Sequence, residues 1–474
     1  MRRHRTPAAD DSERNDQAMS HASDNRGLNR RTFLRYAGGA ILVAAVGVGG
    51  GPRAARSLGG PSPASAADNN PLTFELGGTD GWMYLPPSPG LGAFHPDSYA
   101  PDGLTTYIFG FRNVTGLTET EKFNQKNHAQ HSAPLLWVDE YDGTNEVKIK
   151  LTNLGLAQRP DLFDAHTLHW HGFKNAIPYY DGEPSGSVAV PAGRSFEYAY
   201  RPHDPGTYMW HCHVEDVEHV QMGMTGMIFV RPAMNTPTQK YAYNHASTAY
   251  DREYAMFMSE VWAEAHWADA HIQLPEWSDY RADFALLNGR VYPDTVKPSS
   301  GFTEPHLHPA YDTAYRPYGA GGDLPAIAGQ EELQYQPLSS LVTCNAGERV
   351  LLRFANLGFT QGTMTLTGIR ARVVAKDATL LRGRGNPGVD GSFVTDSITL
   401  GAGESVDAIF EAPAYSGGTG TSGNGYDVYM LYNREFQRSN NLAFQGFGGQ
   451  ATEIHVYPAN HLGAQVFPHQ DVAS

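Results

Sequence analysis

Two short stretches of the chain hold a dense group of metal-binding residue types. AHTLHWHGF, residues 165–173, contains three histidines, and GTYMWHCHVEDVEHVQMGM, residues 206–224, contains three more and one of the chain's two cysteines. A thiolate is a soft ligand and an imidazole a borderline one, so together they suit copper or zinc. A structural zinc site usually takes paired cysteines at short spacing, and the chain has none. We therefore interpret these stretches as a copper site.

Four of the residues have the types that form a blue-copper site, in which two histidines and a cysteine surround the metal and a methionine lies further away. In chain order they are His166, Cys212, His219 and Met224. The last three belong to one loop, between a strand ending in GTYMW and a strand beginning with GMIFV. Such a loop can surround a metal from several sides while the flanking strands hold it rigid.

Four further histidines alternate along the same stretches. They are His169, His171, His211 and His213. Alternate residues of a strand share one face, so His211 and His213 should point away from the site that Cys212 faces. The pattern predicts a second metal centre, joined to the first by a short covalent route for an electron through Cys212 and its neighbours.

The elements that must position these residues are short strands. NEVKIKLTNLG, residues 145–155, alternates Val147, Ile149 and Leu151 with polar side chains, as a half-buried strand does. With 51 glycines, 31 prolines and 18% charged residues, the composition favours a loop-rich β protein.

Strand patterns fill two regions, and we expect two β-sandwiches in tandem, at 71–232 and 250–458, followed by a C-terminal tail at 459–474. EVKIKLTNLG and ERVLLRFANLG are similar enough to indicate an internal duplication. We expect one helix around Glu260–Trp267 and an irregular insertion at 297–330.

The first 66 residues are interpreted as a targeting segment. They contain the twin arginines Arg30 and Arg31, then an apolar stretch at 37–48 that is too short to span a bilayer, and small residues near Ala66 that could be cleaved. This segment resembles a twin-arginine export signal, so we expect a periplasmic, cell-envelope or extracellular protein. An uncleaved membrane anchor is the alternative.

Net charge and cysteine positions exclude other classes. The formal charge of −15 argues against a general affinity for nucleic acid or anionic lipid. Exported proteins often pair their cysteines, but Cys212 stands between two histidines. We therefore expect no disulfide, and a buried free thiol at Cys344.

HTLHWHG and HCHVEDVEHVQMGM resemble the copper motifs of the multicopper oxidase family, which is built from cupredoxin domains. In the second half, NGRVYPDT, VVAKDATLL and ITLGAGESVDAIFEAP are also similar to that family's domains. The resemblance implies an all-β fold of two cupredoxin-like Greek-key sandwiches, the second without an evident copper motif.

The same resemblance implies a role for each motif histidine. Type 1 copper would be held by His166, Cys212, His219 and Met224. A type 2/type 3 copper cluster would be held by His169, His171, His211 and His213, which would be the catalytic residues. Trp170 and Phe173 beside them are interpreted as packing residues, and Asp181 and Glu183 as part of a solvated turn.

The chain departs from the family in its number of histidine pairs. A complete trinuclear cluster uses four His-x-His pairs, and this chain has two. A third pair, His306 and His308, lies in the irregular insertion and is interpreted as part of a surface loop, while His128 and His131 are expected to be exposed or to lie behind the ligands.

The arrangement also resembles copper nitrite reductases, in which histidines matching His171 and His211 bind a type 2 copper with a histidine of a neighbouring subunit. Those enzymes carry an aspartate where this chain has His169, so we favour an oxidase.

Three functions therefore remain. The preferred one is an exported oxidase that takes electrons from a small molecule or metal ion and passes them to dioxygen. The alternatives are a nitrite-reductase-like enzyme with one type 2 copper and a blue-copper electron carrier with a degenerate inner site. Because the inner site is incomplete and needs a cover, we expect a homo-oligomer, most simply a trimer.

Overall fold

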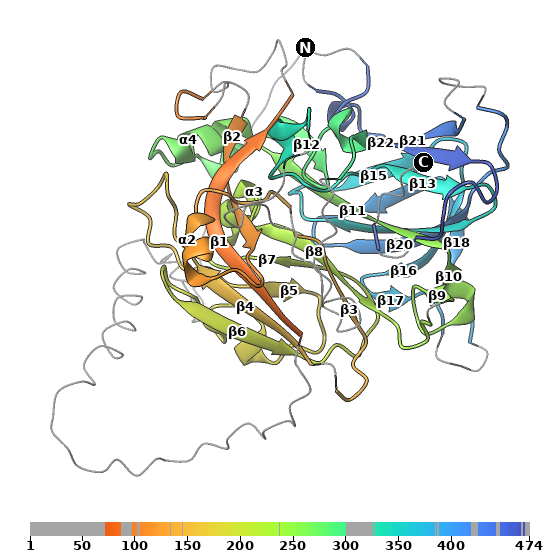
Figure 1. Cartoon of the computed structure of the whole chain (residues 1–474), viewed down its shortest axis with the longest axis horizontal. Coiled ribbons are helices and arrows are strands. Elements are labelled where there is room, and N and C mark those ends of the chain that lie inside the picture. The colour runs from red at the N-terminus through yellow and green to blue at the C-terminus, as the bar shows by residue number, and fades with distance from the viewer. Residues whose placement is uncertain are drawn as a thin grey trace, which may run out of the picture. The chain divides into compact units, whose positions relative to one another are not determined.

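A computed structural model of the chain describes residues 72–469, except 87–96, 102–104, 133, 145, 237, 300–325, 327, 384, 386–387, 419–424, 442–445 and 466–467 (Figure 1). The expected export signal and the pair His306 and His308 lie outside the described residues. Within these residues, no helix has the length and apolar character needed to cross a membrane. Cys212 and Cys344 are both free and buried, as expected.

The first half of the described chain forms two four-stranded sheets, with strand orders β2-β1-β4-β6 and β3-β8-β7-β5. The strands of the first sheet are β1 (Leu72–Tyr84), β2 (Thr105–Asn113), β4 (Val147–Asn153) and β6 (Ser195–Tyr200). Those of the second are β3 (Leu136–Asp139), β5 (His169–His171), β7 (Gly206–His211) and β8 (Thr225–Arg231). In β4, Val147, Ile149 and Leu151 are buried and alternate with partly exposed residues, which confirms the predicted strand pattern.

The second half forms two larger sheets, with orders β12-β11-β14-β20-β16-β17 and β13-β22-β21-β15-β19. The first contains β11 (Arg252–Val261), β12 (Phe284–Leu287), β14 (Arg349–Asn356), β16 (Ala371–Lys376), β17 (Thr379–Leu380) and β20 (Ser405–Glu411), with β18 (Phe393–Thr395) paired to β16. The second contains β13 (Val342–Asn345), β15 (Gly362–Leu366), β19 (Ser397–Leu400), β21 (Asp427–Asn433) and β22 (Ala451–Tyr457). Two short strands, β9 (Lys240–Tyr241) and β10 (Ala249–Tyr250), pair with each other.

The two halves repeat one strand arrangement. β4 pairs in parallel with β1 and antiparallel with β6. Its counterpart β14 pairs in parallel with β11 and antiparallel with β20. The similar sequences of β4 and β14 thus occupy equivalent places, which agrees with the predicted duplication and with an all-β fold of tandem sandwiches.

Within the described residues, helices are few and short. They are α2 (Glu119–Asn124), α3 (Asp216–Met222) and α4 (Ala263–Ala270), with single 3-10 turns at η1 (Pro178–Tyr180), η2 (Ala246–Thr248), η3 (Trp277–Asp279), η4 (Asp294–Val296), η6 (Glu331–Leu333) and η7 (Phe436–Arg438). The helix expected around Glu260–Trp267 begins later than predicted, because Glu260 and Val261 are the last residues of β11.

An apolar interface joins the sandwiches. Trp137, Met209 and Phe229 of the first pack in one cluster with Phe257 and Ala355 of the second. Both faces of β11 and β14 are therefore covered, which explains why nearly every residue of these two strands is buried.

A buried ionic network reinforces this interface. Arg353 on β14 is fully buried, and its Nε lies 2.9 Å from Glu253 Oε2. Its Nη1 lies 3.7 Å from Asp407 Oδ1 and donates to Thr207 Oγ1 of the first sandwich at 3.2 Å. Because these charges are shielded from water, each depends on its partners for neutralisation.

Replacing Arg353 tests that dependence. Arg353→Met should lower the free energy of unfolding by about 3–5 kcal/mol, because it leaves Glu253 and Asp407 buried without their counter-charge. Chemical denaturation followed by tryptophan fluorescence measures the change. Arg372→Met, at an exposed position of β16, is the control and should alter stability by less than about 0.5 kcal/mol. Equal losses in the two variants would contradict the role of the network.

Candidate metal centres

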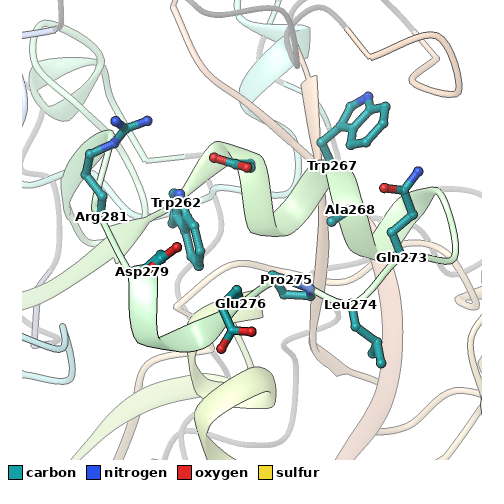
Figure 2. Close-up of a pocket in the computed structure, with 10 residues that line it drawn as sticks. Trp262, Trp267, Ala268, Gln273, Leu274, Pro275, Glu276, Asp279 and Arg281 are labelled. Carbon is teal, nitrogen blue, oxygen red and sulfur yellow. The ribbon is translucent and has the colours of Figure 1, made fainter.

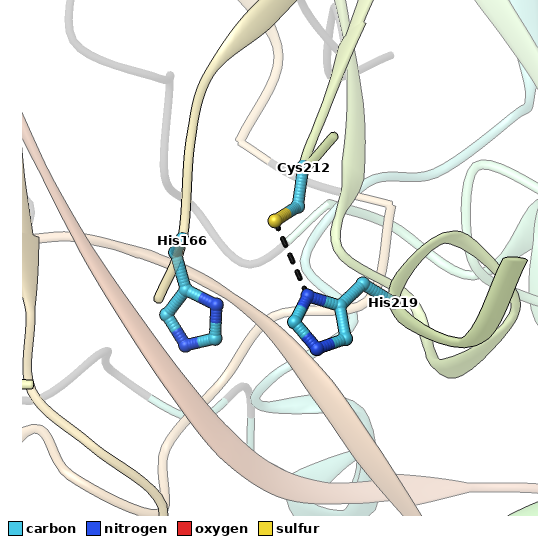
Figure 3. Close-up of side chains that lie close together, drawn as sticks. All are labelled: His166, Cys212 and His219. Carbon is cyan, nitrogen blue, oxygen red and sulfur yellow. Dashed lines mark hydrogen bonds between the residues drawn. The ribbon is translucent and has the colours of Figure 1, made fainter. Parts of the chain in front are cut away.

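The first centre consists of three buried side chains. One ligand atom from each of His166, Cys212 and His219 lies within 4.8 Å of the other two. Cys212 Sγ is 3.2 Å from His219 Nδ1, and Figure 3 shows all three side chains pointing toward one another. The structure thus brings together the three residues that the sequence pattern selects as ligands of one ion.

The loop between β7 and β8 fixes two of these residues by its own backbone hydrogen bonds. Cys212 directly follows β7, and its N–H donates to Met224 O at 3.1 Å. His219 lies in α3, which ends at Gly223 with φ 116°. That left-handed turn, which favours glycine, lets Met224 N–H donate back to His219 O at 2.9 Å.

His166 comes from another part of the chain. Its backbone exchanges two hydrogen bonds with Val190, at 3.0 and 2.9 Å. Gly78 of β1 lies directly against the site, because a Cβ built there would be 2.8 Å from His166 Cδ2 and 3.5 Å from Met224 Cε. A Cβ there would crowd His166 and would be in ordinary contact with Met224. Sequence reasoning missed Gly78, although a glycine inside a strand is a known sign of close approach.

The charge state of this centre favours a metal. Burial opposes ionisation of Cys212, but the neighbouring His219 and His166 hold the pKa of the thiol well below its usual range. Burial likewise lowers the pKa of His219, and the Cys212 thiolate and Asp164 outweigh it and raise that pKa. These pKa shifts describe a thiolate paired with a protonated His219, and loss of that proton to an incoming metal would leave the thiolate and imidazole donors of a copper site.

Buried nitrogen atoms without hydrogen-bond partners also indicate a metal site. Both ring nitrogens of His166 and Nε2 of His219 are buried and have no hydrogen-bond partner. Asp164 Oδ2 approaches His219 Nε2 only to 3.6 Å. Buried polar atoms are nearly always satisfied, so a metal that binds one ring nitrogen of His166 together with His219 Nδ1, the atom beside Cys212 Sγ, fits the residues present.

The second centre lies where β5 pairs with β7. The register places His169 opposite His211 and His171 opposite Met209. One ligand atom from each of His169, His171 and His211 lies within 4.8 Å of the other two. His213 falls outside this group, although its ring centroid is 4.9 Å from that of His169. The structure therefore brings three of the four expected histidines together and the fourth beside them.

The rings of His169 and His211 are each held by a hydrogen bond at Nδ1, which leaves Nε2 available to a metal. His169 Nδ1 is 2.8 Å from Asp181 O, and His211 Nδ1 is 2.8 Å from Cys212 O. A carbonyl can only accept, so Nδ1 carries the proton and Nε2 keeps its lone pair for a metal. Asp181, expected in a solvated turn, thus orients His169 through its backbone oxygen.

Burial also keeps the inner rings neutral. It lowers the pKa of His211 to about 3, and it lowers the pKa of His171, with His169 as the next cause. Neutral imidazole is the form that binds a metal. This donor set of imidazoles fits the type 2 or type 3 copper that the sequence pattern implies.

The second sandwich contacts this inner centre. Gly403, in the turn before β20, has φ +80°, and a Cβ built there would lie 3.0 Å from His171 Nε2. Within the described part of the second sandwich, no histidine joins either group of candidate ligands. The turn therefore acts as a cover rather than as a source of imidazoles.

Other expected residues have ordinary environments. Trp170 is buried and stacks on Tyr200, and Phe173 is buried, so both are packing residues as predicted. Met209, Met222 and Met227 are buried in the core. His131 is also buried, and its Nδ1 bonds Ser132 Oγ at 2.9 Å. His128 stacks on Tyr335.

A separate cavity of about 490 Å³ lies between α4 and residues 273–281 (Figure 2). Trp262, Trp267 and three carboxylates line it, and none of its lining residues belongs to either histidine group. Aromatic faces beside carboxylates suit a small organic cation, but the cavity takes no part in linking the two centres.

A model of the multicopper oxidase family matches residues 133–235, which include all eight expected ligands. The chain carries a multicopper oxidase domain. The comparison with curated proteins found no match. The domain match confirms the expected oxidoreductase class and copper as its metal.

Solved structures extend the likeness beyond this multicopper oxidase domain. A blue copper oxidase from Nitrosomonas europaea is similar with a TM-score of 0.52 and 19% identity, over 81% of this chain and 85% of that one. The multicopper oxidase mgLAC is similar with a TM-score of 0.52 and 20% identity, over 82% and 88%. These likenesses confirm the expected fold. A copper nitrite reductase from Nitrosomonas europaea is similar with a TM-score of only 0.48 and 15% identity, over 84% and 96%, too low to bear on the choice of acceptor.

The close approach of Gly403 to His171 yields a prediction. Gly403→Ala should displace the imidazole and weaken copper binding at the inner centre by about 10–100-fold, the effect usual for a disturbed ligand support, while the blue band persists. Copper analysis and the visible spectrum together measure this.

Gly347→Ala is the matched control, since Gly347 has φ +82° with no atom near its Cβ position. It carries the same backbone strain without the contact, so copper content should not change. Equal copper loss in both variants would show that backbone strain causes the loss, and would contradict the role of the Gly403–His171 contact.

Proposed function

We propose that this protein is an exported copper oxidase that takes electrons from a reducing substrate at one centre and delivers them to dioxygen at the other. Copper, when bound at the two centres, supplies one-electron redox chemistry. His166, Cys212 and His219 would hold type 1 copper, with Met224 as the distant fourth ligand. His169, His171 and His211, with His213 beside them, would hold the inner copper.

The observation that carries the proposal is the position of two consecutive residues, His211 and Cys212. Cys212 faces His219 and His166, while its neighbour His211 faces His169 and His171. A covalent path of one peptide unit therefore connects the two ligand sets. His211 Nδ1–H also donates a hydrogen bond to Cys212 O. This hydrogen bond gives a second connection between the two side chains, with fewer bonds than the covalent path.

The surrounding residues hold and orient the imidazoles. The backbone carbonyl oxygens of Asp181 and Cys212 accept hydrogen bonds from Nδ1 of His169 and His211, so both Nε2 atoms keep their lone pairs. Thr167 Oγ1 accepts from His213 N–H at 2.9 Å and keeps the chain extended after Cys212. The turn at Gly403 limits the access of water to His171.

A nitrite-reductase-like enzyme is the second candidate, and one observation favours it. Among the described residues, His169, His171 and His211 alone form the inner group of ligand atoms within 4.8 Å of one another, and three imidazoles suit a single type 2 copper. In that case His169 would supply the third imidazole from the same chain, and His213 would be a packing residue.

Export and assembly are proposals from the sequence alone. The twin arginines Arg30 and Arg31 support export through a folded-protein route. A homotrimer would give the partly exposed rings of His169 and His213 the cover that Gly403 gives His171.

Removing the thiolate tests the first centre. Cys212→Ser should abolish the intense blue absorption of the copper-loaded protein, because that band needs a cysteine thiolate bound to copper. It should also stop dioxygen consumption with a reducing dye. Cys344→Ser, at the other buried free cysteine, should keep both properties. A colourless wild-type copper protein would contradict the type 1 assignment.

The number of coppers separates the two candidate enzymes. In an oxidase with a multinuclear centre, His213→Ala removes a ligand, so copper per chain falls and dioxygen consumption is lost while the blue band remains. Elemental analysis with electron paramagnetic resonance measures this, and His203→Ala, at an exposed histidine of neither group, is the control. Unchanged copper in His213→Ala, together with nitrite consumption, would favour the reductase.

A further inference from the structure

A line of aromatic rings connects the surface of the first sandwich with the first centre. Trp82 on β1 is partly exposed, and its ring centroid lies 5.3 Å from that of Tyr107. Tyr107 lies 5.6 Å from Phe109, and Phe109 lies 5.6 Å from His219. At these spacings each ring contacts the next, so an unbroken series runs from solvent to a candidate copper ligand.

Tyr107 differs from an ordinary core aromatic in its polar partner. Its hydroxyl is fully buried with the rest of the ring and donates to Asp80 Oδ2 at 2.8 Å. Asp80 is also fully buried and accepts from Gln158 N–H at 2.7 Å. The pair therefore offers a phenol beside a carboxylate base, in a place that water does not reach.

The surroundings hold Tyr107 firmly. Burial raises the pKa of Tyr107, and Asp80 raises it further, so the phenol is neutral at any physiological pH. α4 packs over β2, and His266 Nδ1–H donates to Tyr107 O at 2.6 Å. A neutral, immobile phenol next to a base can lose an electron without leaving a positive charge in the core, provided that its proton moves to the base.

We propose that Trp82, Tyr107 and Phe109 form an electron relay from the surface to His219, in which Asp80 accepts the Tyr107 proton. The relay rests on the proposed type 1 site at His219 and gives it an entry point at Trp82 for an organic one-electron donor.

The electrons and protons of the relay balance in three steps. Tyr107 gives one electron through Phe109 toward His219, where a bound cupric ion would accept it, while the Tyr107 O–H bond breaks and the proton passes to Asp80 Oδ2. Trp82 then gives one electron to the tyrosyl radical, and the proton returns from Asp80 to re-form the O–H bond. The indole radical cation finally takes one electron from the external donor.

Two other described tyrosines lack the combination of a carboxylate partner and a series of ring contacts to a histidine group. Tyr250 donates to Glu253 Oε1 at 2.6 Å, but within the described residues no series of ring contacts leads from it to either histidine group. Tyr208 belongs to the core of the first sandwich, but its hydroxyl donates to the Asp204 carbonyl, which is a poor proton acceptor. These two positions therefore supply matched controls.

Flash photolysis of the copper-loaded, pre-reduced protein tests the relay. A ruthenium polypyridyl photo-oxidant in solution removes an electron at the surface, and arrival of the oxidising equivalent at the first centre appears as growth of the blue band. Tyr107→Phe and Trp82→Phe should each lose the fast phase of this growth, because a phenyl ring is much harder to oxidise. Tyr250→Phe and Tyr208→Phe should retain it.

The copper-free protein provides an independent arm. After the same photo-oxidation, electron paramagnetic resonance should show a tyrosyl radical that disappears in Tyr107→Phe, weakens in Trp82→Phe and persists in both controls. If no copper-loaded sample turns blue, the type 1 assignment fails. The radical experiment on the copper-free protein still shows whether Trp82 and Tyr107 exchange electrons.

Asp80→Asn tests the proton acceptor, since the amide keeps the shape of the carboxylate but cannot take up the proton. The fast phase should become slower and lose its solvent deuterium isotope effect. A fast phase and a radical signal in Tyr107→Phe equal to those of the wild type would overturn the proposal.

Discussion

The extended backbone at the end of β7 is the constraint on which both centres depend. Side chains of an extended chain alternate in direction, so Cys212 turns to one side of the sheet and His211 to the other. Pairing of His211 with His169 on β5 and with Thr225 on β8 holds that backbone straight. A kink or a one-residue slip here would exchange the two sides and separate each side chain from its partners.

Two glycines allow the backbone to pack closely against the histidine rings that β7 helps to position. Gly78 lies against His166 and Met224 on one side of β7, and Gly403 lies against His171 on the other. In both places the missing side chain lets a backbone approach an imidazole. The imidazoles of His166 and His171 are thus held in place partly by close contact with neighbouring backbone.

The sequence predicts the parts of this arrangement that depend on neighbouring residues. Alternation in β4, the spacing of the histidines and the loop around Cys212 are local patterns, and the structure agrees with them. Gly78, Gly403 and the Asp181 carbonyl could not be assigned to the sites, because their contacts arise only when distant strands pair and the two sandwiches pack. The same reason explains His213, whose residue type and spacing fit a ligand although its ring lies just outside the group of three.

The second sandwich contacts the inner histidine group, although none of its described residues belongs to that group. Its β20 begins two residues after Gly403, and Ser405 Oγ donates to Thr207 O of β7 at 2.8 Å. Asp407 Oδ1 accepts from Thr207 Oγ1 at 2.5 Å. The first residues of β7, which ends in His211, are thus hydrogen-bonded to β20. The turn before β20 contains Gly403, which lies against His171. Packing between the sandwiches therefore sets the position of the Gly403 turn relative to His171.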